Sequence, residues 1–187
     1  MKNNNEKNNN VSYTRAYLNL TKMEKDKYIN TIFKDITKNP DSKIFFNSYR
    51  KSEWKTIFHH ATVNLGPIKD KYKLGENLNL IVDSVGIINN DEGKAIALRV
   101  TNMKDYSDNK QPHITLMVRK DGGMPVDSNK ITDWIKLETK IIFPTTVEEF
   151  EYGSDKPRKR EPKVISSLEK HYEEHTRGID SAEMSFS

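Results

Sequence analysis

The chain contains no cysteine among its 187 residues, and this absence excludes several kinds of chemistry. Disulfide bonds, thiolate nucleophiles and zinc sites built on cysteine all require a thiol. A chain without cysteine is also typical of a protein that works in a reducing compartment. Function is therefore expected from histidine, hydroxyl and charged side chains.

Long apolar segments are missing as well. No run approaches the roughly 18 apolar residues of a membrane-spanning helix. The first ten residues, MKNNNEKNNN, have no apolar core of the kind found in a secretory signal. The sequence therefore predicts an intracellular protein with no membrane partner.

Charge is abundant instead. Charged residues make up 31% of the chain and hydrophobic residues 34%, with a net charge of +4 and a pI near 9.0. This apolar content suffices for one ordinary core, so we expect a single domain with polar ends. The basic balance is compatible with a polyanionic partner but does not demonstrate one. No obligate protein partner is inferred.

Composition divides the chain into three parts. Residues 1–11 form an Asn-rich tract that cannot bury surface, so we expect a disordered tail. Residues 12–152 carry the apolar patterns of a folded domain. Residues 153–187 form a charged extension that we expect to be flexible. Its basic run at 156–163 fits a nuclear-import or nucleic-acid patch, although a solvated tail is the commoner meaning of such a run.

Local patterns predict strands with one long helix and one short one. Thr21 and Glu24 form the capping box of a helix predicted over 22–38. Strands are predicted at 13–20, 56–66, 78–88, 94–102, 113–118, 135–143 and 145–152, with a short helix at 125–134. The strands at 78–88 and 94–102 flank the turn NNDEG and are expected to form a hairpin. The fold class is therefore α+β.

One short phrase occurs twice, as HATV at 60–63 and as HITL at 113–116. Side chains alternate between the faces of a strand, so each phrase places a histidine and a threonine on one face. The other face carries apolar residues: Ala61, Val63 and Leu65 in one strand, and Ile114, Leu116 and Val118 in the other. If the two strands are neighbours, His60, Thr62, His113 and Thr115 converge on one shallow cleft.

Such a cleft is suited to phosphodiester chemistry. Histidine titrates near ~6.5, so one imidazole can take a proton from water while another gives one to a departing alkoxide. Threonine hydroxyls can donate to the non-bridging phosphate oxygens. Neither a metal ion nor a cofactor is needed. A single His-x-Thr on a strand is usually surface decoration, but two matched copies among five histidines seldom arise by chance.

The paired phrases resemble the signature of the 2H phosphoesterase superfamily, which includes LigT-like proteins and the cyclic phosphodiesterase domains of fungal and plant tRNA ligases. The similarity extends over about residues 13–150 and includes LGENLNLIVDSVGI, KAIALRV and GGMPVDSNKITDW. It implies a bilobal fold, with two antiparallel sheet lobes around a central cleft and helices outside. It also implies that His60 and His113 are the acid and the base, in an order left open, with Thr62 and Thr115 as phosphate ligands.

The chain departs from multifunctional RNA-repair enzymes in two respects. It has no Walker A phosphate loop, and Arg119 stands where the Lys-x-Asp-Gly nucleotidyltransferase motif has lysine. Kinase and ligase activities are therefore not expected, which leaves the end-healing step.

Several further residues are weaker candidates. Tyr13, Arg15, Trp54 and Phe58 could contact a base or a phosphate, since aromatic faces and guanidinium groups often hold single-stranded nucleotides, although each residue type is more often core or surface. The segment HYEEH at 171–175 fits a zinc-peptidase pattern but has no evident third ligand, so no metal site is predicted.

The sequence thus predicts a metal-independent phosphodiesterase that opens 2',3'-cyclic phosphates at RNA ends. Its partners would be RNA ends or cyclic nucleotides. Two alternatives stay open: cleavage of cyclic oligonucleotide second messengers by the same four residues, and a non-catalytic module that binds RNA or phosphate.

Overall fold

The computed structural model describes residues 10–69, 72–105 and 107–152. The elements are β1 (Tyr13–Leu18), α1 (Lys22–Ile36), α2 (Ser42–Ser48), η1 (Lys51–Glu53), β2 (Trp54–Thr56), β3 (His60–Leu65), β4 (Asn77–Asn90), β5 (Gly93–Val100), β6 (His113–Arg119), η2 (Pro125–Lys130) and β7 (Trp134–Phe150). No helix in these ranges is long and apolar enough to cross a membrane. The extension 153–187, with its segments at 156–163 and 171–175, lies outside the described residues.

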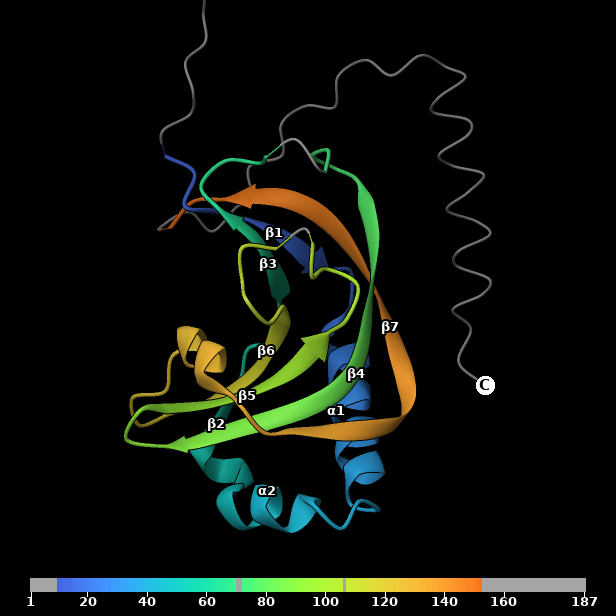
Figure 1. The fold of residues 1–187 in the computed structure, drawn as a ribbon, viewed down its shortest axis with the longest axis vertical. Helices are drawn as coiled ribbons and strands as arrows, with labels where there is room; N and C mark the ends of the chain where they lie inside the picture. Colours follow the sequence, from blue (N-terminus) through green and yellow to red (C-terminus); the bar gives the residue numbers. More distant parts are fainter. Residues whose placement is uncertain (1–9, 70–71, 106, 153–187) are drawn as a thin grey trace, which may run out of the picture.

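The strands form one antiparallel sheet that closes on itself (Figure 1). The closed ring runs β6, β3, β1, β7, β4 and β5, and β5 pairs again with β6. The α+β class is confirmed. The expected pair of separate sheet lobes is not what the pairing gives, because β4 and β7 run alongside each other through both halves of the barrel and join them.

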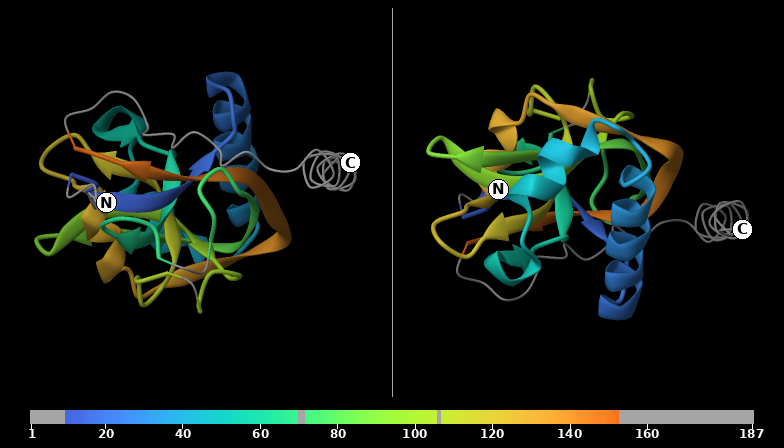
Figure 2. Two further views of the ribbon diagram at one scale, coloured as in Figure 1. Left: turned by 90° about the horizontal axis from the view of Figure 1, so that it is seen from above. Right: turned by 90° about the horizontal axis from the view of Figure 1, so that it is seen from below.

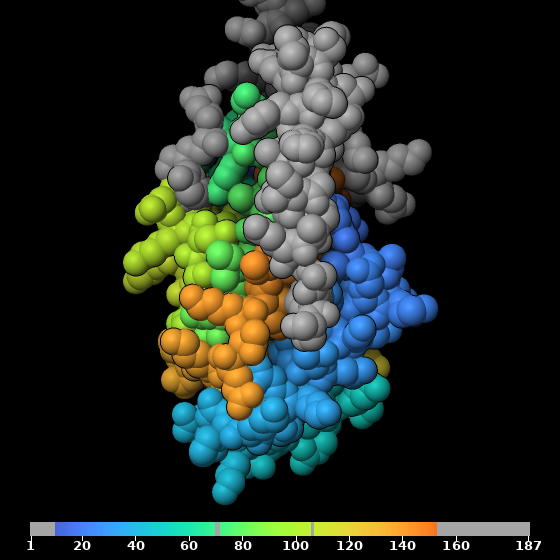
Figure 3. Space-filling view, turned by 90° about the vertical axis from the view of Figure 1, so that its right-hand side faces the viewer, coloured from blue at the N-terminus to red at the C-terminus, as the bar shows by residue number. Residues whose placement is uncertain are grey.

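Helix α1 begins where the sequence predicted. Thr21 and Glu24 make the reciprocal hydrogen bonds of a capping box. Ile29, Ile32 and Ile36 lie on one face of the helix and are buried in the main core. On the side of the molecule seen in Figure 3, the surface of α1 lies beside that of β7. The helix therefore covers part of the barrel wall, and Figure 2 shows the same arrangement from above and from below.

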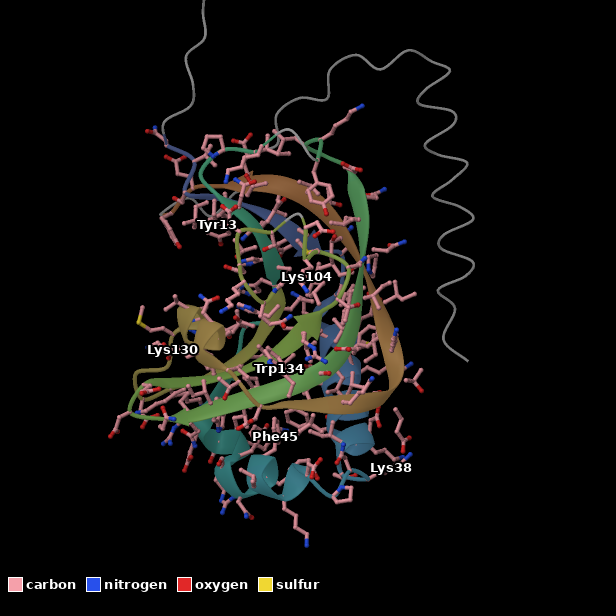
Figure 4. The ribbon with its side chains drawn as sticks, viewed as in Figure 1. Tyr13, Lys38, Phe45, Lys104, Lys130 and Trp134 are labelled. Atoms are coloured by element: carbon pink, nitrogen blue, oxygen red, sulfur yellow. The ribbon has the colours of Figure 1, made fainter. Side chains whose placement is uncertain are left out.

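Helix α2 was not predicted, because its seven residues are too few to show a clear periodicity. Its Phe45 is almost completely buried and points from the helix toward the sheet (Figure 4). The ring of Phe45 packs edge-on against Phe33 of α1, with 5.6 Å between ring centroids. Tertiary packing, rather than local propensity, holds this helix.

Two predictions of strands are wrong in how they divide the chain. The strand expected at 56–66 is broken into β2 and β3 at Phe58, which has a φ of 47°. This left-handed backbone costs on the order of 1–3 kcal/mol for a bulky residue, and the complete burial of the Phe58 ring offsets it. The strands expected at 135–143 and 145–152 are instead one continuous strand, β7.

Candidate active site

The two His-x-Thr phrases lie on neighbouring strands. β3 and β6 pair antiparallel, with Ala61 opposite Ile114, and both of these residues are completely buried. The polar side chains of the phrases therefore lie on the opposite face of the sheet. Continuing this register gives two cross-strand pairs, His60 with Thr115 and Thr62 with His113. The structure thus brings together all four residues that the sequence singled out.

Both phrases end in a β-bulge at the same position. The register between β3 and β1 shifts after Thr62, so Val63 has no partner on β1. The register between β6 and β5 shifts after Thr115, which leaves Leu116 unpaired in the same way. Bulges bend a strand and re-aim its side chains, and they are common beside active sites. The two phrases therefore share a β-bulge as well as a residue pattern.

The bulges also correct two predicted core positions. An extra residue in a strand moves the following side chains to the other face. Leu65 was expected in the core but is 71% exposed. Val118 packs with Ile131 in a separate cluster beside η2, rather than with Ile114 and Leu116 in the main core.

Neighbouring strands extend the face on both sides. On β1, Arg15 lies opposite Thr62 and Tyr17 lies opposite His60. On β5, Arg99 lies opposite His113. Arg99 is bonded to both carboxylate oxygens of Asp83, at 3.0 and 3.2 Å. The four polar side chains therefore sit between two arginines that other residues hold in place.

His60 is held in an unusual environment. Its ring stacks on that of Tyr13, with 5.2 Å between centroids and 30° between planes. Its Nδ1 atom is buried and has no hydrogen-bond partner among the described residues. Burial, followed by the positive charges of Arg15, His59 and His113, lowers the pKa of His60 to about 3. His60 is therefore neutral near pH 7, with one ring nitrogen left unpaired.

His113 is anchored. Its Nδ1 lies 2.8 Å from the carbonyl oxygen of Gln111, and since a carbonyl only accepts, Nδ1 carries the proton. Nε2 is then the free nitrogen of the neutral ring. Burial lowers the pKa of His113, whereas the bond to Gln111 raises it. Of the two imidazoles, His113 is thus the easier to protonate.

The two threonines also differ, because only the hydroxyl of Thr115 is held by hydrogen bonds within the described residues. In the part of the chain that the structure describes, the Thr62 hydroxyl makes no hydrogen bond. The Thr115 hydroxyl lies 3.2 Å from the Pro125 carbonyl oxygen, to which it donates, and 2.8 Å from the Ser128 hydroxyl. Ser128 is 2% exposed and was not singled out from the sequence, although it lies within the conspicuous segment GGMPVDSNKITDW. It is a further residue of the site.

The weaker candidates divide into two pairs. Tyr13 stacks on His60, and Arg15 forms a buried ion pair with Glu148 at 2.7 Å, so both lie at the site in supporting positions. Trp54 and Phe58 are 5% and 0% exposed and belong to the main core. The idea that these two rings contact substrate is wrong, because no face of either ring is available.

Within the described ranges, no three His, Asp or Glu side chains are placed to hold one metal ion. A hollow of about 280 Å³ lies at the β4–β5 turn, at the end of β5 away from Arg99 and His113. Its lining is Asn90, Asp91, Glu92, Gly93, Lys94, Gly122 and Asp127. None of the four phrase residues lines this hollow, although its Asp127 directly precedes Ser128 in η2.

Comparison of the chain with known protein families, with curated proteins and with solved structures finds no match.

Proposed function

We propose that this chain is a phosphodiesterase of the 2H type, which opens 2',3'-cyclic phosphates at RNA ends. The observation that carries the proposal is the placement of His60, Thr62, His113 and Thr115 on one face of two adjacent strands. Each phrase supplies one imidazole, one hydroxyl and one bulge, so the two halves are equivalent in backbone and in side-chain type.

The sheet order supports a two-halved 2H fold. Outward from the β3–β6 pair, β1 and β7 follow on one side, and β5 and β4 follow on the other. This order is symmetric about the pair that carries the histidines. In this proposal the two lobes of the 2H fold correspond to the two halves of the barrel, fused through β4 and β7.

The surroundings of the histidines assign their roles. The acid must carry a proton when substrate is bound, and a phosphodiester anion raises the pKa of an imidazole that it contacts. His113 has a carbonyl supporting its Nδ1 proton and is the easier to charge. Burial and the charge of Arg15 oppose the protonation of His60. His113 is therefore the acid and His60 the base.

The chemical step then balances. His60 takes a proton from water as the water oxygen bonds to phosphorus. The bond from phosphorus to one ribose oxygen breaks, and His113 Nε2 gives that oxygen a proton. The product is a phosphomonoester beside a free hydroxyl, and solvent restores both imidazoles to their starting states. The free Thr62 hydroxyl donates to a non-bridging oxygen, where negative charge is held in the transition state.

Product analysis tests the proposal. The purified chain is incubated with a metal chelator and with RNA ending in a 2',3'-cyclic phosphate, 2',3'-cyclic mononucleotides and cyclic dinucleotides. We expect conversion of cyclic-phosphate ends to monophosphates, and a loss of about 10²–10⁴ in rate for His60→Ala and for His113→Ala. His171→Ala is the matched control, and it should retain full activity.

Three results would contradict the proposal. They are no turnover of any substrate, activity that survives both active-site substitutions, and activity that returns only with added zinc and is lost in His171→Ala. Retained RNA affinity without product at any pH from 5 to 8 would instead indicate a binding module.

A further inference from the structure

A cluster of basic residues lies beside His60. The Lys25 amine, from α1, lies 5.9 Å from the centroid of the Tyr17 ring, and Tyr17 lies opposite His60 across β1 and β3. His59 directly precedes His60, and the charges of Lys25 and Lys55 both act on it. Lys55 lies on β2, opposite Val118 of β6, the strand that also carries His113. The residues Lys25, Lys55 and His59 therefore come from three segments: α1, β2 and the residue before β3. These three residues are called the basic cluster below.

The lysines of this cluster are not neutralised. Within residues 10–69, 72–105 and 107–152, neither Lys25 nor Lys55 has a carboxylate within ion-pair distance. Other lysines do form ion pairs: Lys38 with Glu138, Lys69 with Asp108, and Lys94 with Asp121.

Partial burial makes positive charge at Lys25 and His59 less favourable. Partial burial lowers the pKa of Lys25. Burial, followed by Lys25, Arg15 and Lys55, lowers the pKa of His59. Like charges held together with partial loss of solvent are unfavourable unless an anion joins them. The cluster is therefore suited to an anionic ligand immediately beside the proposed catalytic face.

The structure of an RNA end indicates which phosphate could bind the basic cluster. In an RNA chain that ends in a 2',3'-cyclic phosphate, the nearest other phosphate is the one on the 5' oxygen of the terminal nucleoside. A 2',3'-cyclic mononucleotide with a free 5' hydroxyl has no such group.

We propose that the basic cluster binds the 5' phosphate of the terminal nucleotide, so that the enzyme prefers RNA ends to cyclic mononucleotides. This inference rests on the proposed function and names the substrate feature that the same site recognises. The cations act on binding, not on bond breaking, because they lie beside the histidine and threonine pairs rather than among them.

The test compares two substrates that differ by one phosphate. They are a nucleoside 2',3'-cyclic phosphate and the same compound carrying a 5' phosphate. We expect the 5' phosphate to raise kcat/KM about tenfold, mainly through KM. Lys25→Gln combined with Lys55→Gln should remove most of this gain and leave the rate on the unphosphorylated compound unchanged.

A matched control has the same change in net charge. Lys34 and Lys43 are exposed residues of α1 and α2, and Lys34 lies on the side of α1 opposite Lys25, nine residues further along the helix. Lys34→Gln combined with Lys43→Gln should preserve the full preference for the 5' phosphate. Equal kcat/KM on the two substrates in the wild type, or an equal loss on both in the Lys25 and Lys55 variant, would overturn the inference.

Failure of the proposed function has a different signature. If neither these compounds nor RNA with a 2',3'-cyclic phosphate end is hydrolysed, the proposed function is wrong, and the cluster is then tested by the binding of a trinucleotide with a 3' phosphate. Weaker binding of the Lys25 and Lys55 variant, with a slope of log affinity against log salt reduced by about 0.7 per lost phosphate contact, would support the phosphate site. Unchanged affinity and an unchanged slope would refute it.

Discussion

The β3 and β6 halves of the site have the same phrase and the same bulge but different surroundings. In the β6 half, Gln111 fixes His113, while Pro125 and Ser128 hold Thr115. In the β3 half, Nδ1 of His60 and the hydroxyl of Thr62 have no hydrogen-bond partner among the described residues.

In the proposed mechanism, this difference gives the two copies of a repeated sequence two chemical roles. The repeat places equivalent groups opposite each other. Gln111 and η2 then anchor the β6 half, while the β3 half stays unpaired among the described residues. An anchored imidazole with a supported proton suits an acid, while a buried, unpaired imidazole beside Arg15 suits a base. The buried, unpaired Nδ1 of His60 also costs free energy in the absence of ligand, since a buried polar atom without a partner costs about 1–3 kcal/mol.

The largest effect on turnover, after loss of a histidine, is expected at the unpaired threonine. Thr62→Val removes a hydroxyl that is free to donate to the phosphate, so kcat should fall by about 10². The free energy of unfolding should stay within about 0.5 kcal/mol of the wild type, because no hydrogen bond within the described structure is lost. Steady-state kinetics and denaturant unfolding measure the two quantities. Unchanged kcat would remove Thr62 from the mechanism.

Thr115→Val should affect stability more than kcat, the reverse of Thr62→Val. The hydroxyl of Thr115 is engaged with Pro125 and Ser128, so kcat should fall by about tenfold or less. The substitution leaves the buried Ser128 hydroxyl without its partner, so the protein should lose about 1–3 kcal/mol of stability. The same two measurements apply, and equal profiles for the two valine variants would contradict the asymmetry between the halves.

Ser128→Ala separates positioning from simple support. Removing this hydroxyl frees Thr115 to reorient. We therefore expect kcat to fall about threefold, while KM for cyclic-phosphate RNA stays the same. Ser128→Thr, which restores a hydroxyl, should recover part of the loss. A fall in stability with no change in kcat would show that Ser128 is only structural.

The pH dependence of stability is expected to be the smallest effect. The pKa of His60 is lowered to about 3 and that of His113 is also lowered, so both are depressed relative to about 6.5 in the unfolded chain. Their contribution is complete above pH 6.5 and is lost as the pH falls, because the unfolded chain then binds protons that the folded chain does not. His60 can contribute a slope of up to about 1.4 kcal/mol per pH unit between pH 6 and 4, and His113 contributes in the same direction.

Denaturant unfolding at pH 7 and pH 5 measures this slope. His60→Gln should reduce it and His113→Gln should reduce it less. A slope that neither substitution changes would contradict the buried, neutral state of the two imidazoles.

Local sequence patterns predicted the parts of the fold that local physics decides. The Thr21 and Glu24 capping box and the alternation within each phrase depend on near neighbours, and the structure confirms both. Closure of the barrel depends on long-range pairing of β5 with β6 and of β4 with β7, which no local pattern encodes.

The misplaced residues have equally specific causes. The exposure of Leu65 follows from the bulge at Val63, and a bulge has no distinct sequence signal in a run of β-forming residues. The burial of Trp54 and Phe58 follows from the turn of the chain into the core at Phe58, a left-handed backbone that phenylalanine seldom adopts. Ser128 and Lys25 reach the site from η2 and α1, whose positions depend on tertiary packing, so spacing could not place them beside it. Lys55 is near His60 in sequence, but the break at Phe58 interrupts the strand alternation that would relate the two.

The most direct test of the account is a titration of the histidine rings by NMR, with and without an RNA trinucleotide that carries a 3' phosphate. In the free protein, both His60 and His113 should titrate below 6.5, His60 the lower at about 3. On binding, the pKa of His113 should rise above 6.5 and that of His60 should rise less, because one phosphate contacts both strands. If the trinucleotide leaves both pKa values unchanged, the two phrases do not form one phosphate site, and the account fails.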